Sequence, residues 1–135
     1  MNVLDTTKRV GEYLLPYFFA ERDEVVYLLC LDAKCKPLCV RLLSRGSLNS
    51  AAVEPRKVVQ AALSANAASV VLAHNHPSGV ALPSEEDRKV TALVFRALNA
   101  VEILLADHLV VAGADYVSLA EDGLIEELME GQNGL

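Results

Sequence analysis

Apolar residues follow two different spacings along the chain, and these spacings predict its helices and strands. In residues 5–19, Val10, Leu14 and Phe18 recur at helical spacing behind polar residues that can cap a helix. We therefore expect a first helix whose apolar face docks on a sheet. Residues 25–31 form a nearly continuous apolar run, which is typical of a strand buried on both faces.

The middle of the chain predicts a hairpin, a loop, a helix and a buried strand. Residues 32–37 look like a turn and residues 38–43 like the returning strand of the hairpin. Residues 44–53 are polar and small, which indicates a loop. Pro55 suits the first position of a helix. The expected apolar face of this helix consists of Val58, Val59, Ala62 and Leu63. Residues 68–73 (ASVVLA) predict a short buried strand that ends in HNHPSG.

A further helix is expected to start at residues 83–84, where a proline precedes a serine. Its inward side chains are expected to be Val90, Leu93, Val94 and Leu98. Residues 101–106 and 109–111 then predict two separate strands, because the polar pair Asp-His at residues 107–108 interrupts the apolar run.

The last third of the chain completes the predicted architecture. A turn at residues 113–115 leads to a short strand near 116–119, and a helix follows over about 120–129. Residues 131–135 should fray. Helices alternate with strands and hairpins, so we expect the α/β (α+β) class, with a mixed sheet flanked by helices in a single domain over residues 1–135.

Composition limits the possible environment and partners. Hydrophobic residues make up 53% of 135 residues and aromatic ones only 5%, so the core of this domain must be aliphatic. The formal net charge of -6 argues against nucleic acid as a partner of this domain, since phosphate binding needs a basic surplus. The sequence shows no secretory leader and no apolar run long enough for a membrane span, so we expect a cytoplasmic protein with no membrane segment.

The residues that carry chemistry lie in HNHPSGVALPSEED. Residues i and i+2 of an extended segment point the same way, so His74 and His76 can present two imidazoles from one strand end. A catalytic zinc site needs three protein ligands and one open position, and Asp87, in the first turn of the next helix, can supply the third. The stretch therefore predicts a metal site.

A purely structural interpretation of the same residues is open. Ser84 and Asp87 match an N-terminal capping box, which by itself needs no metal. An isolated H-x-H pair is also more often incidental than a ligand pair. The metal hypothesis is favoured because two of only three histidines share one loop, between a buried strand and a helix start.

The spacing H-x-H, seven residues, Ser, two residues, Asp is that of the JAMM (MPN+) metalloprotease motif. The stretches SRGSLNS, PRKVVQAALSANAASVVLAHNHPSG, PSEED and DHLVV closely resemble the RadC family, which carries this motif, and the likeness covers about residues 24–125. The resemblance implies a cytidine-deaminase-like sandwich with zinc at one sheet end. Many family members also carry a helix-hairpin-helix region associated with DNA, and we expect a domain without that region here.

The resemblance also implies roles for single residues. His74, His76 and Asp87 would be the zinc ligands, and Ser84 would donate a hydrogen bond to the oxyanion of a tetrahedral intermediate. Glu24, at the start of the first strand, would activate the water on the zinc and return its proton to the leaving amine. A glutamate before an apolar run is common. The alternatives for this role are Glu21, Asp23 and Glu54.

Three further residues have two interpretations each. Gly79 is expected to relax the backbone of the P-S-G turn, and Ser78 either contacts substrate or is simply exposed, which is favoured. His108 could assist a metal ligand, but a buried, hydrogen-bonded structural histidine is the favoured interpretation.

The cysteines Cys30, Cys35 and Cys39 form an odd and closely spaced set, which favours free thiols in a reducing compartment over a disulfide framework. A second zinc site is conceivable, but three thiols without a fourth ligand are incomplete, so we expect them to serve in packing. Zinc deaminase activity is excluded, because the chain lacks both H-x-E and P-C-x-x-C.

Two functions remain. The leading hypothesis is a zinc-dependent hydrolase (a JAMM-type metallopeptidase) that cleaves a peptide or isopeptide bond in a substrate the sequence does not identify. The alternative is a non-catalytic or DNA-repair-associated binding module of the RadC family. The chain retains the full ligand set, which favours the enzyme. The sequence indicates no oligomeric state.

Overall fold

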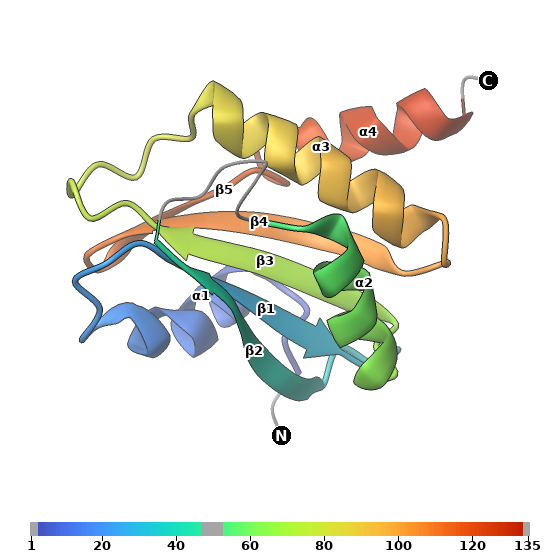
Figure 1. The fold of residues 1–135 in the computed structure, drawn as a ribbon, viewed down its shortest axis with the longest axis horizontal. Coiled ribbons are helices and arrows are strands. Elements are labelled where there is room, and N and C mark those ends of the chain that lie inside the picture. The colour runs from blue at the N-terminus through green and yellow to red at the C-terminus, as the bar shows by residue number, and fades with distance from the viewer. Residues whose placement is uncertain (1–2, 47–52, 134–135) are drawn as a thin grey trace.

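A computed structural model describes residues 3–46 and 53–133 of the chain. It shows three layers, with a five-stranded sheet between the N-terminal helix on one face and three helices on the other (Figure 1). The predicted α/β class with a mixed sheet flanked by helices is therefore confirmed. No helix in the described ranges is both long and apolar enough to cross a bilayer.

The first layer is helix α1 (Thr7–Leu14), which continues into the short 3₁₀ helix η1 (Leu15–Phe18). Thr6 caps α1 by accepting a hydrogen bond from the Arg9 amide. The apolar side of both helices packs on the sheet, as the spacing predicted. This contact contains Val10, Leu14 and Phe18 together with Val25, Leu29, Val71, Ala73, Leu109 and Val111.

The sheet has the strand order β2-β1-β3-β4-β5. Its members are β1 (Val25–Leu31), β2 (Pro37–Arg45), β3 (Ser69–Asn75), β4 (Leu104–Ala112) and β5 (Asp115–Ser118). Only β3 and β4 run parallel, and the other three neighbouring pairs are antiparallel. A parallel pair needs a crossover, which helix α3 (Glu85–Asn99) provides. The end of β3 and the start of α3 consequently lie at the same end of the sheet.

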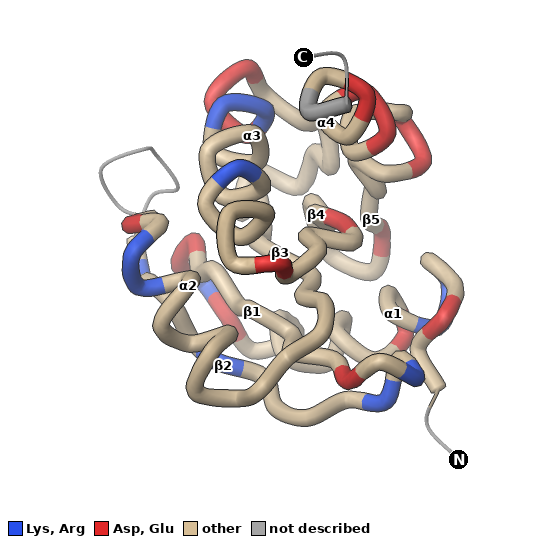
Figure 2. Tube along the Cα trace, turned by 90° about the vertical axis from the view of Figure 1, so that its right-hand side faces the viewer, with Lys and Arg blue, Asp and Glu red and all other residues tan. Residues whose placement is uncertain are grey.

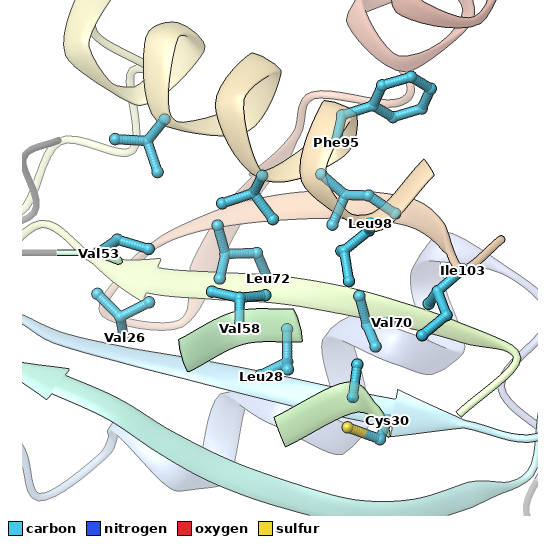
Figure 3. Close-up of a cluster of buried hydrophobic side chains, with 14 of the residues drawn as sticks. Val26, Leu28, Cys30, Val53, Val58, Val70, Leu72, Phe95, Leu98 and Ile103 are labelled. Atoms are coloured by element: carbon cyan, nitrogen blue, oxygen red, sulfur yellow. The ribbon is translucent and has the colours of Figure 1, made fainter. Parts of the chain in front are cut away.

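The third layer comprises α2 (Pro55–Ser64), α3 and α4 (Leu124–Asn133). The core between these helices and the sheet is aliphatic apart from Phe95 and Cys30 (Figure 3). Two side chains predicted to point inward are wrong: Leu63 is 56% exposed and Leu93 is 39% exposed. Leu63 directly follows the buried Ala62, and Leu93 follows the buried Val90 by three positions. Both therefore lie to one side of the residues, spaced four apart, that contact the sheet.

The prediction of two strands separated by residues 107–108 is also wrong, because β4 is one continuous strand. Val70 pairs with Leu105 and Val71 with Asp107, so Ala106 is an extra residue in a β-bulge. Polar residues inside a strand do not break it when they are hydrogen-bonded. The carboxylate of Asp107 accepts from the amides of His108 and Ala120 and from the Ser118 hydroxyl.

Several predicted boundaries shift. The last helix begins at Leu124 rather than at 120, after a turn in which Gly123 has a positive φ of 87°. That helix continues to Asn133, so residues 131–133 of the tail are helical. Strand β2 extends to Arg45, two residues into the predicted loop. Residues 47–52 of that loop lie outside the described part of the chain.

The two leucines of α3 allow a matched test of the core. Leu98 is fully buried between α3 and the sheet, whereas Leu93 is on the outer side of the same helix. We expect Leu98→Ala to lower the free energy of unfolding by about 2–5 kcal/mol and Leu93→Ala by less than about 1 kcal/mol. Urea denaturation of both variants measures the difference, and equal losses would contradict this assignment of the helix faces.

Candidate metal centre

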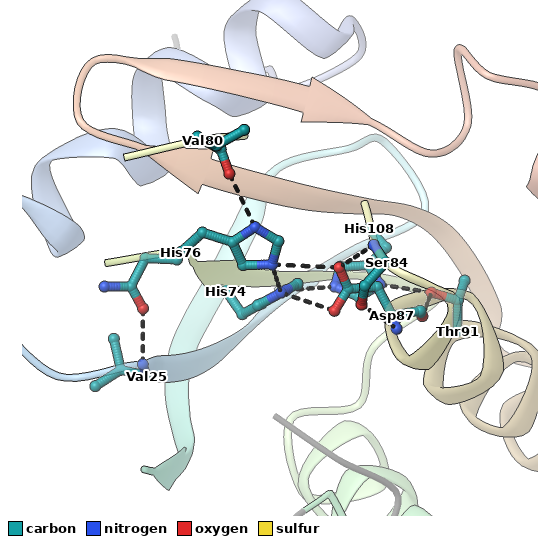
Figure 4. Close-up of polar contacts among 9 residues, drawn as sticks. Val25, His74, His76, Val80, Ser84, Asp87, Thr91 and His108 are labelled. Carbon is teal, nitrogen blue, oxygen red and sulfur yellow. Dashed lines mark hydrogen bonds and ion pairs between the residues drawn. The ribbon is translucent and has the colours of Figure 1, made fainter. Parts of the chain in front are cut away.

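Three side chains meet at the end of the sheet where β3 stops and α3 begins (Figure 4). His74 Nε2 lies 3.1 Å from His76 Nε2 and 3.1 Å from Asp87 Oδ1. His76 Nε2 lies 3.3 Å from Asp87 Oδ2. His74 and Asp87 are buried and His76 is partly buried. The structure thus brings together the three residues that the sequence singled out.

The capping box of α3 orients the carboxylate of Asp87. The Ser84 amide donates to Asp87 Oδ2 at 2.7 Å, and the Asp87 amide donates to Ser84 Oγ at 3.1 Å. Burial raises the pKa of Asp87, but contacts with His74 and the Ser84 amide outweigh burial and hold that pKa well below its usual range. Asp87 therefore presents an ionised carboxylate to both histidines.

A chain of hydrogen bonds fixes the tautomer of His74. Thr91 Oγ1 donates to the Asp87 carbonyl oxygen at 2.6 Å, so it must accept from His108 Nδ1, which lies 2.5 Å away. Burial and, next, the neighbouring His74 lower the pKa of His108 well below its ordinary value, so His108 is neutral. Its Nε2 then accepts from His74 Nδ1 at 2.8 Å. This leaves Nε2 of His74 directed at Asp87, where it donates to the carboxylate when protonated and offers a lone pair to a metal ion when deprotonated.

The same reasoning applies to His76. Its Nδ1 lies 3.0 Å from the carbonyl oxygen of Val80, which can only accept. His76 therefore donates from Nδ1, and its Nε2 is directed at Asp87. The short loop from β3 to α3 thus orients this imidazole through its own backbone.

The Nε2 atoms of two imidazoles and a carboxylate consequently face one another within about 3 Å. Electron-pair donors so close together repel unless a positive charge lies between them. Two nitrogens and one carboxylate oxygen suit a divalent transition metal ion. His74, His76 and Asp87 are positioned to bind such an ion, and they are the one group of three residues in the described ranges with this property.

The bulge in β4 is what brings His108 to this site. Beyond the extra residue Ala106, His108 pairs with Leu72 and shares the face of the sheet that α3 covers. Without the bulge, the alternation of side chains would turn His108 toward α1. The favoured interpretation of a buried, hydrogen-bonded histidine holds, and its bond to His74 also gives it a place beside the candidate ligands.

Glu24 lies at the same end of the sheet. Val26 pairs with His74 across β1 and β3, and Glu24, two residues earlier, belongs to the same face by strand periodicity. Its carbonyl oxygen accepts from the Gly46 amide at 2.7 Å, which continues the pairing of β1 with β2. Glu24 therefore lies just beyond the last paired residues of β1 and β3, at the end of the sheet where His76 also lies.

The alternatives to Glu24 lie at other positions. Glu21 forms a bidentate ion pair with Arg45, with N–O distances of 2.6 and 3.2 Å, and this contact lowers the pKa of Glu21. Glu54 Oε1 lies 3.6 Å from Lys57 Nζ at the start of α2. Asp23 is exposed, and as the residue before Glu24 it belongs to the opposite face by strand periodicity. Glu24 remains the carboxylate whose register fits the site best.

The remaining predicted residues lie outside the ligand cluster. Gly79 adopts a positive φ of 89° in the turn after His76, as expected for its backbone, and Ser78 is exposed. Cys30 is buried and faces Cys39 across β1 and β2; burial and then Cys39 raise the pKa of Cys30 to about 12. Such a thiol is inert and serves in packing.

Sequence reasoning missed Thr91, Val80 and Asn75, which orient this end of the sheet. Thr91 lies one helical turn after Asp87, and a polar residue in the inward row of α3 was the available signal. Val80 acts through its backbone, so its side chain carries no signal. Asn75, the middle residue of H-x-H, is buried and bonds across to β1.

A mixed sheet with two histidines and a carboxylate at a strand-to-helix junction defines an α/β domain with a candidate metal centre of the JAB type. A family model described as RadC-like JAB domain matches residues 4–124. The chain belongs to this family.

Curated relatives agree with the family. The chain is 45% identical over 123 residues to a UPF0758 protein of Methylibium petroleiphilum, an alignment that covers 91% of this chain and 55% of the relative. It is 42% identical over 122 residues to a UPF0758 protein of Pseudomonas fluorescens, with coverage of 90% and 54%. The chain therefore spans about half the length of the curated relatives it matches.

The hydrogen bond from His74 to His108 should set metal affinity. In His108→Leu the Nδ1–H of His74 loses its acceptor, so the imidazole is free to rotate or change tautomer. We expect metal affinity to fall roughly 10- to 100-fold. Competition with a chromophoric chelator measures the dissociation constant.

Leu93→Ala, on the outer face of α3, is the matched control and should bind metal like the unmodified protein. An unchanged affinity in His108→Leu would contradict the tautomer assignment.

Proposed function

We propose that the domain is a zinc-dependent hydrolase of the JAMM type that cleaves peptide or isopeptide bonds. The observation that carries the proposal is the convergence of the Nε2 atoms of His74 and His76 on the ionised Asp87, at the end of the sheet where Glu24 precedes β1. Membership of the RadC-like JAB family supports it, because the chain retains the complete motif of that family.

Zinc fits this set of ligands better than other common ions. Imidazole nitrogen and a carboxylate oxygen are typical zinc ligands, whereas magnesium and calcium prefer oxygen alone. Two neutral histidines and one carboxylate around a divalent zinc ion would leave about one net positive charge at the site. When bound, zinc would polarise the scissile carbonyl and make the attacking water more acidic.

Glu24 would act as general base and acid. Its carboxylate would take the proton of the attacking water and deliver it to the nitrogen of the leaving amine. The backbone at Glu24 is hydrogen-bonded to Gly46, just after β2, and its neighbours Asp23 and Val25 bond to Asn75 on β3, which suits a base that must hold a fixed position.

Ser84 would stabilise the oxyanion without giving up its cap. Its Oγ accepts from the Asp87 amide, and a hydroxyl that accepts still has its own proton to donate. Ser84 is exposed to solvent at the mouth of the site, so a substrate oxygen can reach that proton. The cap and the catalytic role are therefore compatible in one side chain.

The location proposed for the protein is the cytoplasm. This rests on three cysteines that are all free thiols, including the facing pair Cys30 and Cys39, because such pairs are typical of a reducing compartment.

Zinc analysis of the purified protein tests the site directly. We expect about one zinc ion per chain, lost in His74→Ala and Asp87→Ala because each removes one of three ligands. Mass spectrometry of metal content after dialysis provides the measurement. Asp87→Asn keeps an oxygen that can accept from the Ser84 amide. Loss of zinc in this variant is therefore due to the lost charge and not to the lost cap.

Glu130→Ala, an exposed carboxylate on α4, serves as the control and should keep its zinc. Full zinc occupancy in Asp87→Ala would rule out the proposed ligand set.

Glu24→Gln separates binding from catalysis. The variant keeps the size of the side chain but cannot take a proton, so it should bind zinc normally and lose about 10²- to 10⁴-fold in hydrolysis rate. A peptide and isopeptide library, incubated with the zinc-loaded protein and read by mass spectrometry, measures cleavage. Glu21→Gln is the matched control and should cleave like the unmodified protein.

Zinc bound without any cleavage across the library would favour the binding module of the RadC family over the enzyme. Equal cleavage by Glu24→Gln would remove Glu24 from the mechanism.

A further inference from the structure

Asn75 lies between the two candidate histidine ligands, and its side chain is directed toward β1. Its Oδ1 accepts from the Val25 amide at 2.7 Å, a bond drawn as the dashed line at Val25 in Figure 4. Its Nδ2 donates to the carbonyl oxygen of Asp23 at 3.0 Å. The side chain is only 6% exposed, and both halves of the amide are used. The two bonds lie directly on either side of Glu24.

The sheet explains why a side chain is needed at this point. Backbone pairing between β1 and β3 runs from Leu31–Ser69 to Val26–His74 and stops there. Pairing between β3 and β4 continues to Asn75–Val111, and the His76 amide then donates to the Val111 carbonyl oxygen at 2.7 Å. The chain at His76 therefore stays with β4 while it leaves β1. The amide of Asn75 replaces the missing ladder bonds.

Together with β2, Asn75 fixes the backbone around Glu24 from two sides. The Glu24 carbonyl oxygen accepts from Gly46, and the flanking groups of Asp23 and Val25 bond to Asn75. These three bonds set the direction of the bond that leads into the Glu24 side chain. A general base has to be held within about 0.5 Å of its productive position, so this constraint matters for catalysis.

We infer that Asn75 is a positioning residue that holds Glu24 across the opened seam between β1 and β3, facing the candidate metal centre. The inference rests on the proposed function for the role of Glu24. A buried amide is costly unless both of its polar halves are satisfied, and an apolar residue at this position could satisfy neither the Val25 amide nor the Asp23 carbonyl.

Acetohydroxamate provides a probe that does not depend on the natural substrate. It binds zinc through its oxygens, and its remaining proton can be donated to a carboxylate beside the metal. A double-mutant cycle with Asn75→Ala and Glu24→Gln then shows whether the two residues act through one another. The measurement is the acetohydroxamate dissociation constant of each zinc-loaded variant, by isothermal titration calorimetry.

Asn75→Ala should keep its zinc, because its side chain does not contact the three ligand atoms, and should bind acetohydroxamate about tenfold more weakly. In the Glu24→Gln background the same change should have no further effect. Asn75→Asp keeps the acceptor for Val25 but sets a carboxylate oxygen against the Asp23 carbonyl oxygen, and should show at least as large a loss. Additive losses, or no loss in Asn75→Ala, would overturn the inference.

Ser118→Ala is the matched control, since it removes a buried hydrogen bond to Asp107 away from Glu24. It should leave acetohydroxamate binding unchanged, and an equal loss in this variant would mean that Asn75 acts only through general stability.

Hydrogen exchange of the Val25 amide tests whether Asn75 holds the backbone beside Glu24, and this test does not depend on the metal. Asn75→Ala should speed this exchange about tenfold in the metal-free protein. Unchanged exchange would show that Asn75 does not hold this segment. If the unmodified protein takes up no zinc, the proposed function fails, while the exchange of Val25 still decides whether Asn75 holds this segment.

Discussion

The structure at the end of the sheet depends on one electrostatic constraint, the need for a positive charge, from a proton or a metal ion, among three groups that can donate electron pairs. The Nε2 atoms of His74 and His76 and the carboxylate of Asp87 lie 3.1–3.3 Å apart, a distance that without a cation between them is unfavourable. Each donor is held in place from behind by a hydrogen bond to a different part of the chain, so none can turn away at low cost. The surrounding fold therefore prepares the site before any ion binds.

The residues of this cluster could be predicted because their relations are local in sequence. His74 and His76 share a face through strand periodicity, and Asp87 reaches them because it occupies the third position of a capped helix. The capping box of Ser84 and Asp87 is present, and it is compatible with the metal interpretation of Asp87. The same bond that caps α3 also aims the carboxylate. The strands of the sheet were likewise predictable from continuous apolar runs.

Non-local features were not predictable from the sequence. The bulge at Ala106 changes which way His108 faces, and nothing in the apolar pattern indicates that an extra residue is accommodated there. Asn75 has a role only because β1 and β3 separate at a particular register, which depends on residues 50 positions apart. Leu93 faces solvent because α3 packs on the sheet through Val90, Val94 and Leu98, although the spacing of Leu93 is equally compatible with an inward position.

The cost of holding the donors together links the metal to stability. A buried carboxylate and two lone pairs without a cation lower the free energy of unfolding, and the hydrogen bonds behind them offset only part of this. An ion that binds the folded chain and not the unfolded one stabilises it by RT ln(1 + [L]/Kd), about 4 kcal/mol at a thousandfold excess over Kd. His108 and Thr91 extend this link into the core, because they tie the ligand His74 to the inner face of α3. The hydrogen bonds behind the candidate ligands are therefore also the route by which metal binding would strengthen the packing of α3 on the sheet.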